Sequence, residues 1–350
     1  MSIKDLSPDA TLSGIVKFLD KLEYQDDNFA NRNARLETLN LVWKSTAEHF
    51  ENLIRAEKIR VAPKLVYKAI QPSVRGNVYS LGNLSIPLLV DLSIYWTFFF
   101  INELGGFKDP SMETFLPDLL SGAEQRSEFW FLMNEHLPRL LSHYGPFCGL
   151  TIFRSTLGWC QGSWLEKRNI IGYPGAHRYP TYLRHLTGLS ENGCVSLFPK
   201  EIIDEDENLQ HIAVLLPHMV TYVDKVNDLF SFYKEVHDPD DRINAATTYS
   251  HAHGVTLQES FEYIVEEAVS CLEQIRTVFT KGRVPAVQKV VESTLQGYVT
   301  YHICEDRYRL GELTEKGGDD PNATEFSRYY NMIRKVGWFD PSEWPQPRDV

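Results

Sequence analysis

Apolar side chains recur every three to four residues along most of this chain, and this spacing constrains the fold more than any other feature. It is plainest in residues 12–24, 36–58, 133–145, 261–279 and 287–310. The period is typical of amphipathic α-helices, whereas the strict alternation that marks strands is scarce. Glycine and proline interrupt the pattern repeatedly. We therefore predict an all-α bundle of roughly ten to twelve helices.

The 350 residues show no internal repeat and no low-complexity linker. A chain of this length can bury a sizeable core, and large single domains are common. We predict one domain over residues 1–350, with residues 1–10 and 340–350 as surface tails. The second tail contains several prolines, which cannot continue a helix.

The formal net charge of −12 argues against a nucleic-acid partner, which needs a basic face. Any phosphate bound here must be met by local cations or metal ions. The five cysteines lack C-x-x-C spacing, so neither a disulfide framework nor a zinc site is indicated. The first residues do not read as a signal peptide, and we expect a cytoplasmic location.

The most apolar segment is IPLLVDLSIYWTFFFI, residues 86–101. It is shorter than the roughly 20 residues that span a bilayer, and it carries Asp91 in its middle. We predict a buried helix and no stable membrane insertion.

The segment VNDLFSFYKE, residues 226–235, places an amide, a hydroxyl and a carboxylate four residues apart. On a helix, Asn227, Ser231 and Glu235 would form one stripe, each about 40° further round than the last. These are oxygen ligands that magnesium accepts. A solvated polar stripe is the ordinary alternative, but the apolar neighbours make unpaired polar groups costly. Lys234 adds a cation where a phosphate would lie.

This segment resembles the second metal-binding motif of class I terpene cyclases, and more narrowly that of the fungal trichodiene synthase family. The resemblance extends over nearly the whole chain. It includes residues 145–189 with TYLRHL, SLFPKE (196–201), GYVTYHICEDRYRL (297–310) and PSEW (341–344). Several long blocks in one order are more specific than a short motif.

The resemblance implies an all-α fold of class I terpenoid synthases around a deep apolar pocket. It implies that magnesium, in a cluster of three ions, triggers loss of diphosphate from farnesyl diphosphate. Carried over by position, Asn227, Ser231 and Glu235 would bind one magnesium. The diphosphate would be bound by Arg184, Lys234, Arg307 and Tyr308. A homodimer is implied by the resemblance alone.

Physical chemistry supports a role for arginine in this reaction independently of the resemblance. Loss of diphosphate concentrates negative charge on the leaving group, so fixed donors act most strongly as that charge develops. Guanidinium groups present paired donors to phosphate oxygens. An isolated surface salt bridge would be the ordinary role of either arginine without the neighbouring motifs.

A carbocation needs a dry cavity with aromatic walls, because water would convert it to an alcohol. The candidate pocket residues are Tyr95, Phe99, Phe153, Trp159, Tyr298 and Tyr301, with Trp96 and Phe98 beside the first two. Most aromatic residues in a helical bundle are ordinary core, so about half of these should face the pocket.

The first metal motif departs from the family pattern, which normally opens with two adjacent acids. The chain reads NELGGFKDP, so Glu103 takes the leading acidic position and Leu104 replaces the second acid. Glu103 could bridge metal ions, with Asp109 or water completing the shell. The alternative is a site that has lost its trinuclear geometry and is slow or only binds ligand. We favour retained activity because the other site residues match together.

Three weaker patterns are assigned no chemistry. DPDD (238–241) matches an acid motif of protonating cyclases, but its proline and position after the metal helix indicate an exposed loop. The histidines of HAH (251–253) are expected in a polar turn. DEDEN (204–208) is expected to be a solvated segment.

We therefore predict a magnesium-dependent sesquiterpene cyclase that converts farnesyl diphosphate to trichodiene or a related product. The main competitor is a non-catalytic or weakly active paralogue that binds prenyl diphosphate. A chain-elongating prenyltransferase is a third possibility, weakened by the absence of two D-D-x-x-D motifs.

Overall fold

The computed structural model describes residues 8–107, 112–238, 243–282, 284–316, 321–340 and 342–343. Within these ranges it contains fifteen α-helices, one 3-10 helix and no β-strand. The all-α prediction is confirmed. The number of helices exceeds the predicted number because short helices have too few residues to show an apolar period. Examples are α9 (Ser190–Val195) and α14 (Gly311–Lys316).

The remaining helices are α1 (Pro8–Leu22), α2 (Arg32–Arg55), α3 (Pro63–Ser80), α4 (Ile86–Glu103), α5 (Met112–Ser121), α6 (Glu128–Ser142), α7 (Pro146–Glu166), α8 (Tyr179–Thr187), α10 (Glu205–His237), α11 (Ala245–His253), α12 (Leu257–Gly282), α13 (Pro285–Cys304) and α15 (Pro321–Gly337). The 3-10 helix covers Asp306–Tyr308. The tails largely lie outside the described ranges, and a single domain remains a prediction.

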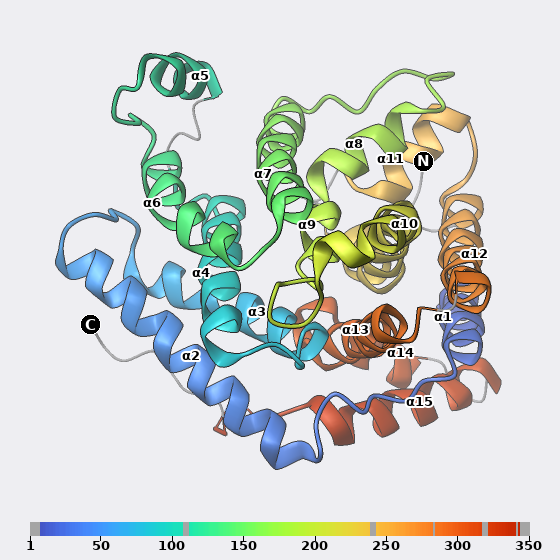
Figure 1. The fold of residues 1–350 in the computed structure, drawn as a ribbon. Helices are drawn as coiled ribbons and strands as arrows, with labels where there is room; N and C mark the ends of the chain where they lie inside the picture. The colour runs from blue at the N-terminus through green and yellow to red at the C-terminus, as the bar shows by residue number, and fades with distance from the viewer. Residues whose placement is uncertain are drawn as a thin grey trace.

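The longest helix, α10, runs for 33 residues and carries the Asn-Ser-Glu stripe. It packs against α9, α12 and α13, and it lies inside the arrangement of helices in Figure 1. Asp204 caps its start by accepting from the backbone N–H of Glu207 at 3.2 Å. The stripe is therefore carried by an interior helix.

The prediction of a solvated segment at residues 204–208 is wrong for Glu205. Glu205 is buried, and its carboxylate accepts from the backbone N–H groups of Phe147 and Cys148 at 2.8 and 2.9 Å. These donors belong to the first turn of α7, where N–H groups lack helical partners. Gly145 leaves the space, because a Cβ there would meet the Glu205 carboxylate.

The prediction of a polar turn for HAH is wrong, because these histidines lie in a helix. α11 begins with a capping box in which Asn244 and Thr247 bond reciprocally, and it ends at Gly254 with a φ of 67°. These caps extend the helix as far as His253. In the DPDD run, residues 239–241 lie outside the described ranges.

α4 is the one described helix long and apolar enough to cross a membrane, but 67% of its apolar window is buried inside the protein. Pro87 stands in its first turn, where the missing N–H has no helical partner to lose. The helix ends in a Schellman motif. Gly105 has a φ of 73°, and the N–H of Gly106 donates to the carbonyl of Ile101 at 2.8 Å. Glu103 consequently occupies the last turn.

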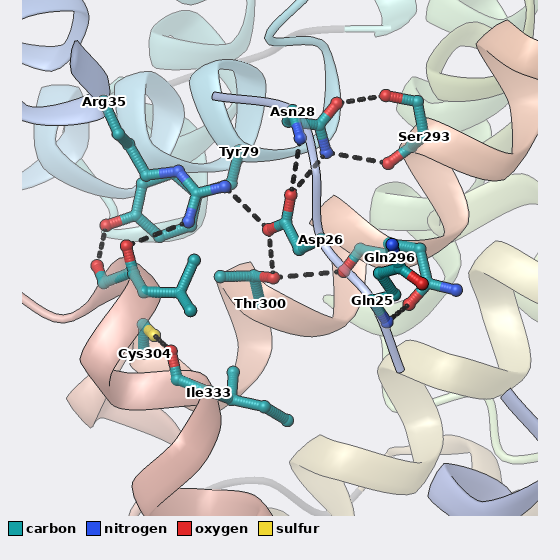
Figure 2. A network of polar contacts seen from close by, with 12 residues as sticks. Gln25, Asp26, Asn28, Arg35, Tyr79, Ser293, Gln296, Thr300, Cys304 and Ile333 are labelled. Carbon is teal, nitrogen blue, oxygen red and sulfur yellow. Dashed lines mark hydrogen bonds and ion pairs between the residues drawn. The ribbon is translucent and has the colours of Figure 1, made fainter. Parts of the chain in front are cut away.

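A buried ion pair joins the segment after α1 to the start of α2 (Figure 2). Arg35 Nη2 lies 2.7 Å from Asp26 Oδ2, and the two side chains are 1% and 0% exposed. Asp26 also accepts from the Thr300 hydroxyl on α13. Arg35 donates further to the carbonyl of Val336 in α15 at 3.1 Å. This network fixes the side of α13 that bears Thr300. The opposite side of α13 reaches the site described below.

Candidate active site

Two adjoining chambers lie between α3, α4, α8, α10 and α13. The inner chamber, of about 200 Å³, has aromatic walls that include Trp96, Phe100 and Tyr298. The outer chamber, of about 280 Å³, is mainly polar. Both are lined by Glu103, Arg184, Thr187, Asn227 and Arg307. These five residues therefore form the boundary between an apolar pocket and a polar mouth.

The stripe on α10 reaches this boundary. Asn227 lines both chambers and Glu235 lines the outer one. Ser231 lines neither, and its side chain is buried at 3% exposure. Among the described residues, the Ser231 hydroxyl has no hydrogen-bond partner. Lys234 also lines the outer chamber.

The side-chain oxygen atoms of Asn227, Ser231 and Glu235 fit a hard cation. An orphaned buried hydroxyl is costly unless something binds it, and the helix places an amide and a carboxylate one turn to either side. Among the described residues there is no cluster of three His, Cys, Asp or Glu that could hold a metal. A metal here would depend on neutral oxygen ligands as well as carboxylates, as magnesium sites do.

Glu103 contributes the carboxylate on the opposite side of the mouth. Its side chain is accessible through the chambers, yet it lies deep enough that burial raises the pKa of the carboxyl above its ordinary value. Arg307, Lys234 and Arg184 act in the opposite direction. A cation bound beside Glu103 would stabilise its charged form in the same way. Asp109, its predicted helper, lies outside the described residues.

Arg184, on α8, is held by α10. Its Nε donates to Asp228 Oδ1 at 2.6 Å, and its Nη2 donates to Asn227 Oδ1 at 3.0 Å. Its Nη1 lies 3.5 Å from Asp224 Oδ1. Burial disfavours the charge, but Asp228 and Asp224 outweigh this and raise the pKa of Arg184. The guanidinium is therefore a permanent cation at the boundary.

Arg307 and Tyr308 lie on the 3-10 turn that follows α13. The Arg307 guanidinium stands 5.3 Å from the Phe100 ring and 5.0 Å from the Tyr308 ring. Within the described part of the chain, Arg307 forms no ion pair. The buried Arg75–Glu305 pair, at 3.3 Å, anchors the start of this turn. Arg307 thus offers its donors to an anion in the mouth.

The predicted aromatic residues occupy different places. Tyr298 and Tyr301 line the inner chamber, as does Trp96, and Trp159 lines the outer one. Tyr95, Phe98, Phe99 and Phe153 line neither chamber. Tyr95 bonds to Thr156 at 2.7 Å, Phe99 packs on Trp159 at 4.6 Å, and Phe153 packs against the core.

Sequence reasoning missed several residues that contact the site. Phe100 lines the inner chamber, Asp224 and Asp228 hold Arg184, and His302 contacts Asn227. Asp224 and Asp228 are four residues apart on α10, and this spacing was the available signal. Nothing in the sequence distinguished His302 from an ordinary core histidine.

Comparisons with known proteins show the family of this chain. A family model described as trichodiene synthase (TRI5) matches residues 7–350. The trichodiene synthase of Fusarium asiaticum is 35% identical over 340 residues, which cover 96% of this chain and 90% of that protein. The trichodiene synthase of Stachybotrys chartarum is 35% identical over 342 residues, covering 97% and 89%. That of Gibberella pulicaris is 36% identical over 339 residues, covering 96% and 88%.

A helical bundle with an apolar chamber behind a mouth of carboxylate, amide and guanidinium groups is, with this match, a class I terpene cyclase fold. The chain belongs to the trichodiene synthase family. The predicted fold, family and enzyme class are therefore confirmed.

Proposed function

We propose that this protein is a magnesium-dependent sesquiterpene cyclase acting on farnesyl diphosphate. The main support is the direct junction between an apolar chamber and a polar one, through Glu103, Arg184, Asn227 and Arg307. A prenyl diphosphate has the same division, with a hydrocarbon chain at one end and an anion at the other. The chain would enter the inner chamber and the diphosphate would stay at the mouth.

The cationic residues bind and orient the diphosphate. Arg307 can present two parallel N–H donors, and Lys234 adds a point charge beside the Asn-Ser-Glu stripe. Arg184 is pre-positioned by Asp228, and the Tyr308 hydroxyl lies 3.3 Å from Asn227 Nδ2. Such fixed donors act most strongly on charge that develops during the reaction.

Asn227, Ser231 and Glu235 would hold one magnesium ion, with Glu103 facing them as a carboxylate for the remaining ions of a three-metal cluster. Magnesium bound there would supply the positive charge that makes diphosphate a good leaving group. We propose that Glu103 replaces the missing aspartate motif.

In the proposed reaction, the C1–O bond of farnesyl diphosphate breaks and diphosphate leaves with the electron pair. A double bond of the same chain attacks the allylic cation, and loss of a proton or addition of water ends the sequence. Trp96, Phe100 and Tyr298 present rings to this cation, each worth roughly 0.5 to 2 kcal/mol. The apolar walls also keep water away.

The product we propose is trichodiene or a related sesquiterpene. The named relatives are trichodiene synthases, but they share only 35–36% of residues with this chain. Ring pattern depends on the contour of the inner chamber, and one changed wall residue can redirect a cation.

Incubation with farnesyl diphosphate and magnesium, followed by gas chromatography and mass spectrometry of volatile products, tests the proposal. A cyclic sesquiterpene is expected. Binding of the substrate without any product would favour the non-catalytic paralogue. Longer prenyl diphosphates formed after addition of isopentenyl diphosphate would favour the prenyltransferase.

Two further expectations rest on resemblance and composition. We propose a homodimer, to be tested by light scattering on the purified protein. We also propose a cytoplasmic location, since the five cysteines are unpaired and buried. Fluorescent tagging in the source cell would test it.

A further inference from the structure

His302 lies fully buried behind the proposed metal ligand Asn227. Its Nε2 atom is 3.1 Å from Asn227 Nδ2, and its Nδ1 atom is 2.7 Å from the carbonyl oxygen of Tyr298. Its ring packs against Phe230 at 5.6 Å and Tyr308 at 4.9 Å. These contacts hold the imidazole in one orientation.

The hydrogen bonds assign the tautomer of this histidine. A carbonyl oxygen can only accept, so the proton must lie on Nδ1. In the neutral ring, Nε2 is then an acceptor, and the amide of Asn227 must donate to it.

The same bonds determine which end of the Asn227 amide faces the mouth. With its NH₂ group directed to His302 and to the Tyr308 hydroxyl, Oδ1 points the other way. Arg184 confirms this orientation independently, because a guanidinium only donates and its Nη2 lies 3.0 Å from Oδ1. A flipped amide would present N–H groups to a cation and could not bind it.

We propose that His302 is a positioning residue that keeps the Asn227 amide oxygen directed at the metal site. The inference rests on the proposed role of Asn227 as a magnesium ligand. Arg184 cannot replace His302, because Arg184 is also assigned to the diphosphate. His302 acts from behind the ligand, as partners of metal ligands commonly do, and loss of such a partner weakens metal affinity by about 10–100-fold.

The test compares His302→Phe, which keeps the ring but removes the acceptor, with His302→Gln, whose amide oxygen can still accept. Isothermal titration calorimetry with inorganic diphosphate, repeated at several magnesium concentrations, gives the magnesium concentration needed for diphosphate binding. This magnesium requirement is measured without turnover. We expect the His302→Phe variant to need at least about 10-fold more magnesium than the unchanged protein. His302→Gln should restore most of the affinity.

His136→Phe is the matched control. This buried histidine also bonds a backbone carbonyl, that of Asp91 at 2.8 Å, but it lines neither chamber. We expect its magnesium requirement to be that of the unchanged protein. A normal requirement in folded His302→Phe would overturn the role of His302 alone. If the unchanged protein binds diphosphate without any need for magnesium, the proposed function fails as well.

A second measurement does not depend on any variant folding. Nitrogen-15 NMR of the histidine-labelled protein reports the protonation of each ring nitrogen. We expect His302 to be neutral with its proton on Nδ1. A proton on Nε2 would overturn the inference, because Asn227 would then have to turn its oxygen toward the histidine.

Discussion

The guanidinium of Arg184 on α8 donates through Nε to Oδ1 of Asp228 on α10, at 2.6 Å. Lys225 lies 3.6 Å from the other carboxylate oxygen, so Asp228 is shared between two cations. Asp228 belongs to the same helix as the Asn-Ser-Glu stripe. This pair therefore couples the position of an arginine that we propose to bind diphosphate to the position of the proposed magnesium ligands.

We expect Asp228→Asn to impair turnover more than it impairs folding. The amide keeps the size of the side chain but removes the charge that holds Arg184 at the boundary. Misplacement of a binding group should lower kcat/KM for farnesyl diphosphate on the order of 10-fold to 100-fold. Steady-state kinetics would measure this. Asp206→Asn, at an exposed position in the first turn of α10, is the control, and equal loss in both variants would contradict the prediction.

The raised pKa of Glu103 predicts how activity depends on pH. Only the ionised carboxylate binds magnesium, so activity should be present at high pH and fall as pH decreases through the pKa of Glu103. Since burial raises that pKa, the fall should begin at a higher pH than for an ordinary glutamate. More magnesium competes with the proton and should shift the fall to lower pH. Initial rates across pH at two magnesium concentrations would test this.

Glu103→Ala provides the check on that assignment. The variant should be severely impaired at every pH, because the site loses its second carboxylate. Full activity, or a pH profile indifferent to magnesium, would show that the altered first motif does not bind metal. Glu113→Ala, at an exposed position on α5, serves as the control.

Asp26→Asn should destabilise the protein by about 3–5 kcal/mol, because it leaves the buried Arg35 charge unpaired. Thermal or urea unfolding would measure the change. Asp27→Asn alters the neighbouring exposed residue and should have little effect. A loss below about 1 kcal/mol for Asp26→Asn would contradict the structural role of the pair.

Phe100→Leu should change the product mixture while leaving consumption of farnesyl diphosphate within about 10-fold, since it alters a wall of the inner chamber. Phe98→Leu is the matched control on the same helix. Phe98 packs against Phe50 at 5.4 Å and lines neither chamber. Gas chromatography would compare the two. The same product spectrum from both would contradict the assignment of Phe100 to the wall.

The helices were predictable because their apolar period is strong, but the face of α4 that meets the cavity was not. That helix is apolar all round, so no polar side sets its rotation, and Tyr95 and Phe99 could not be separated from Trp96 and Phe100. The motif residues Arg184, Asn227 and Arg307 do meet at the boundary, and Glu235 lines the outer chamber beside it.

Other site features depend on contacts between segments distant in sequence. Arg184 and Asp228 are 44 residues apart, and Asn227 and His302 are 75 apart. Glu205 belongs to an acidic run whose sequence predicts a solvated segment, yet its carboxylate bonds to the first turn of α7. Local periodicity carries no information about such pairs.

The most direct test of the whole account is diphosphate release from farnesyl diphosphate by the unchanged protein and by Glu235→Gln. The substitution removes one negative charge from the Asn-Ser-Glu stripe with little change in side-chain volume. We predict magnesium-dependent release by the unchanged protein, and release lowered at least about 100-fold by a folded Glu235→Gln variant. Equal release by both proteins, or release that does not need magnesium, would contradict the account.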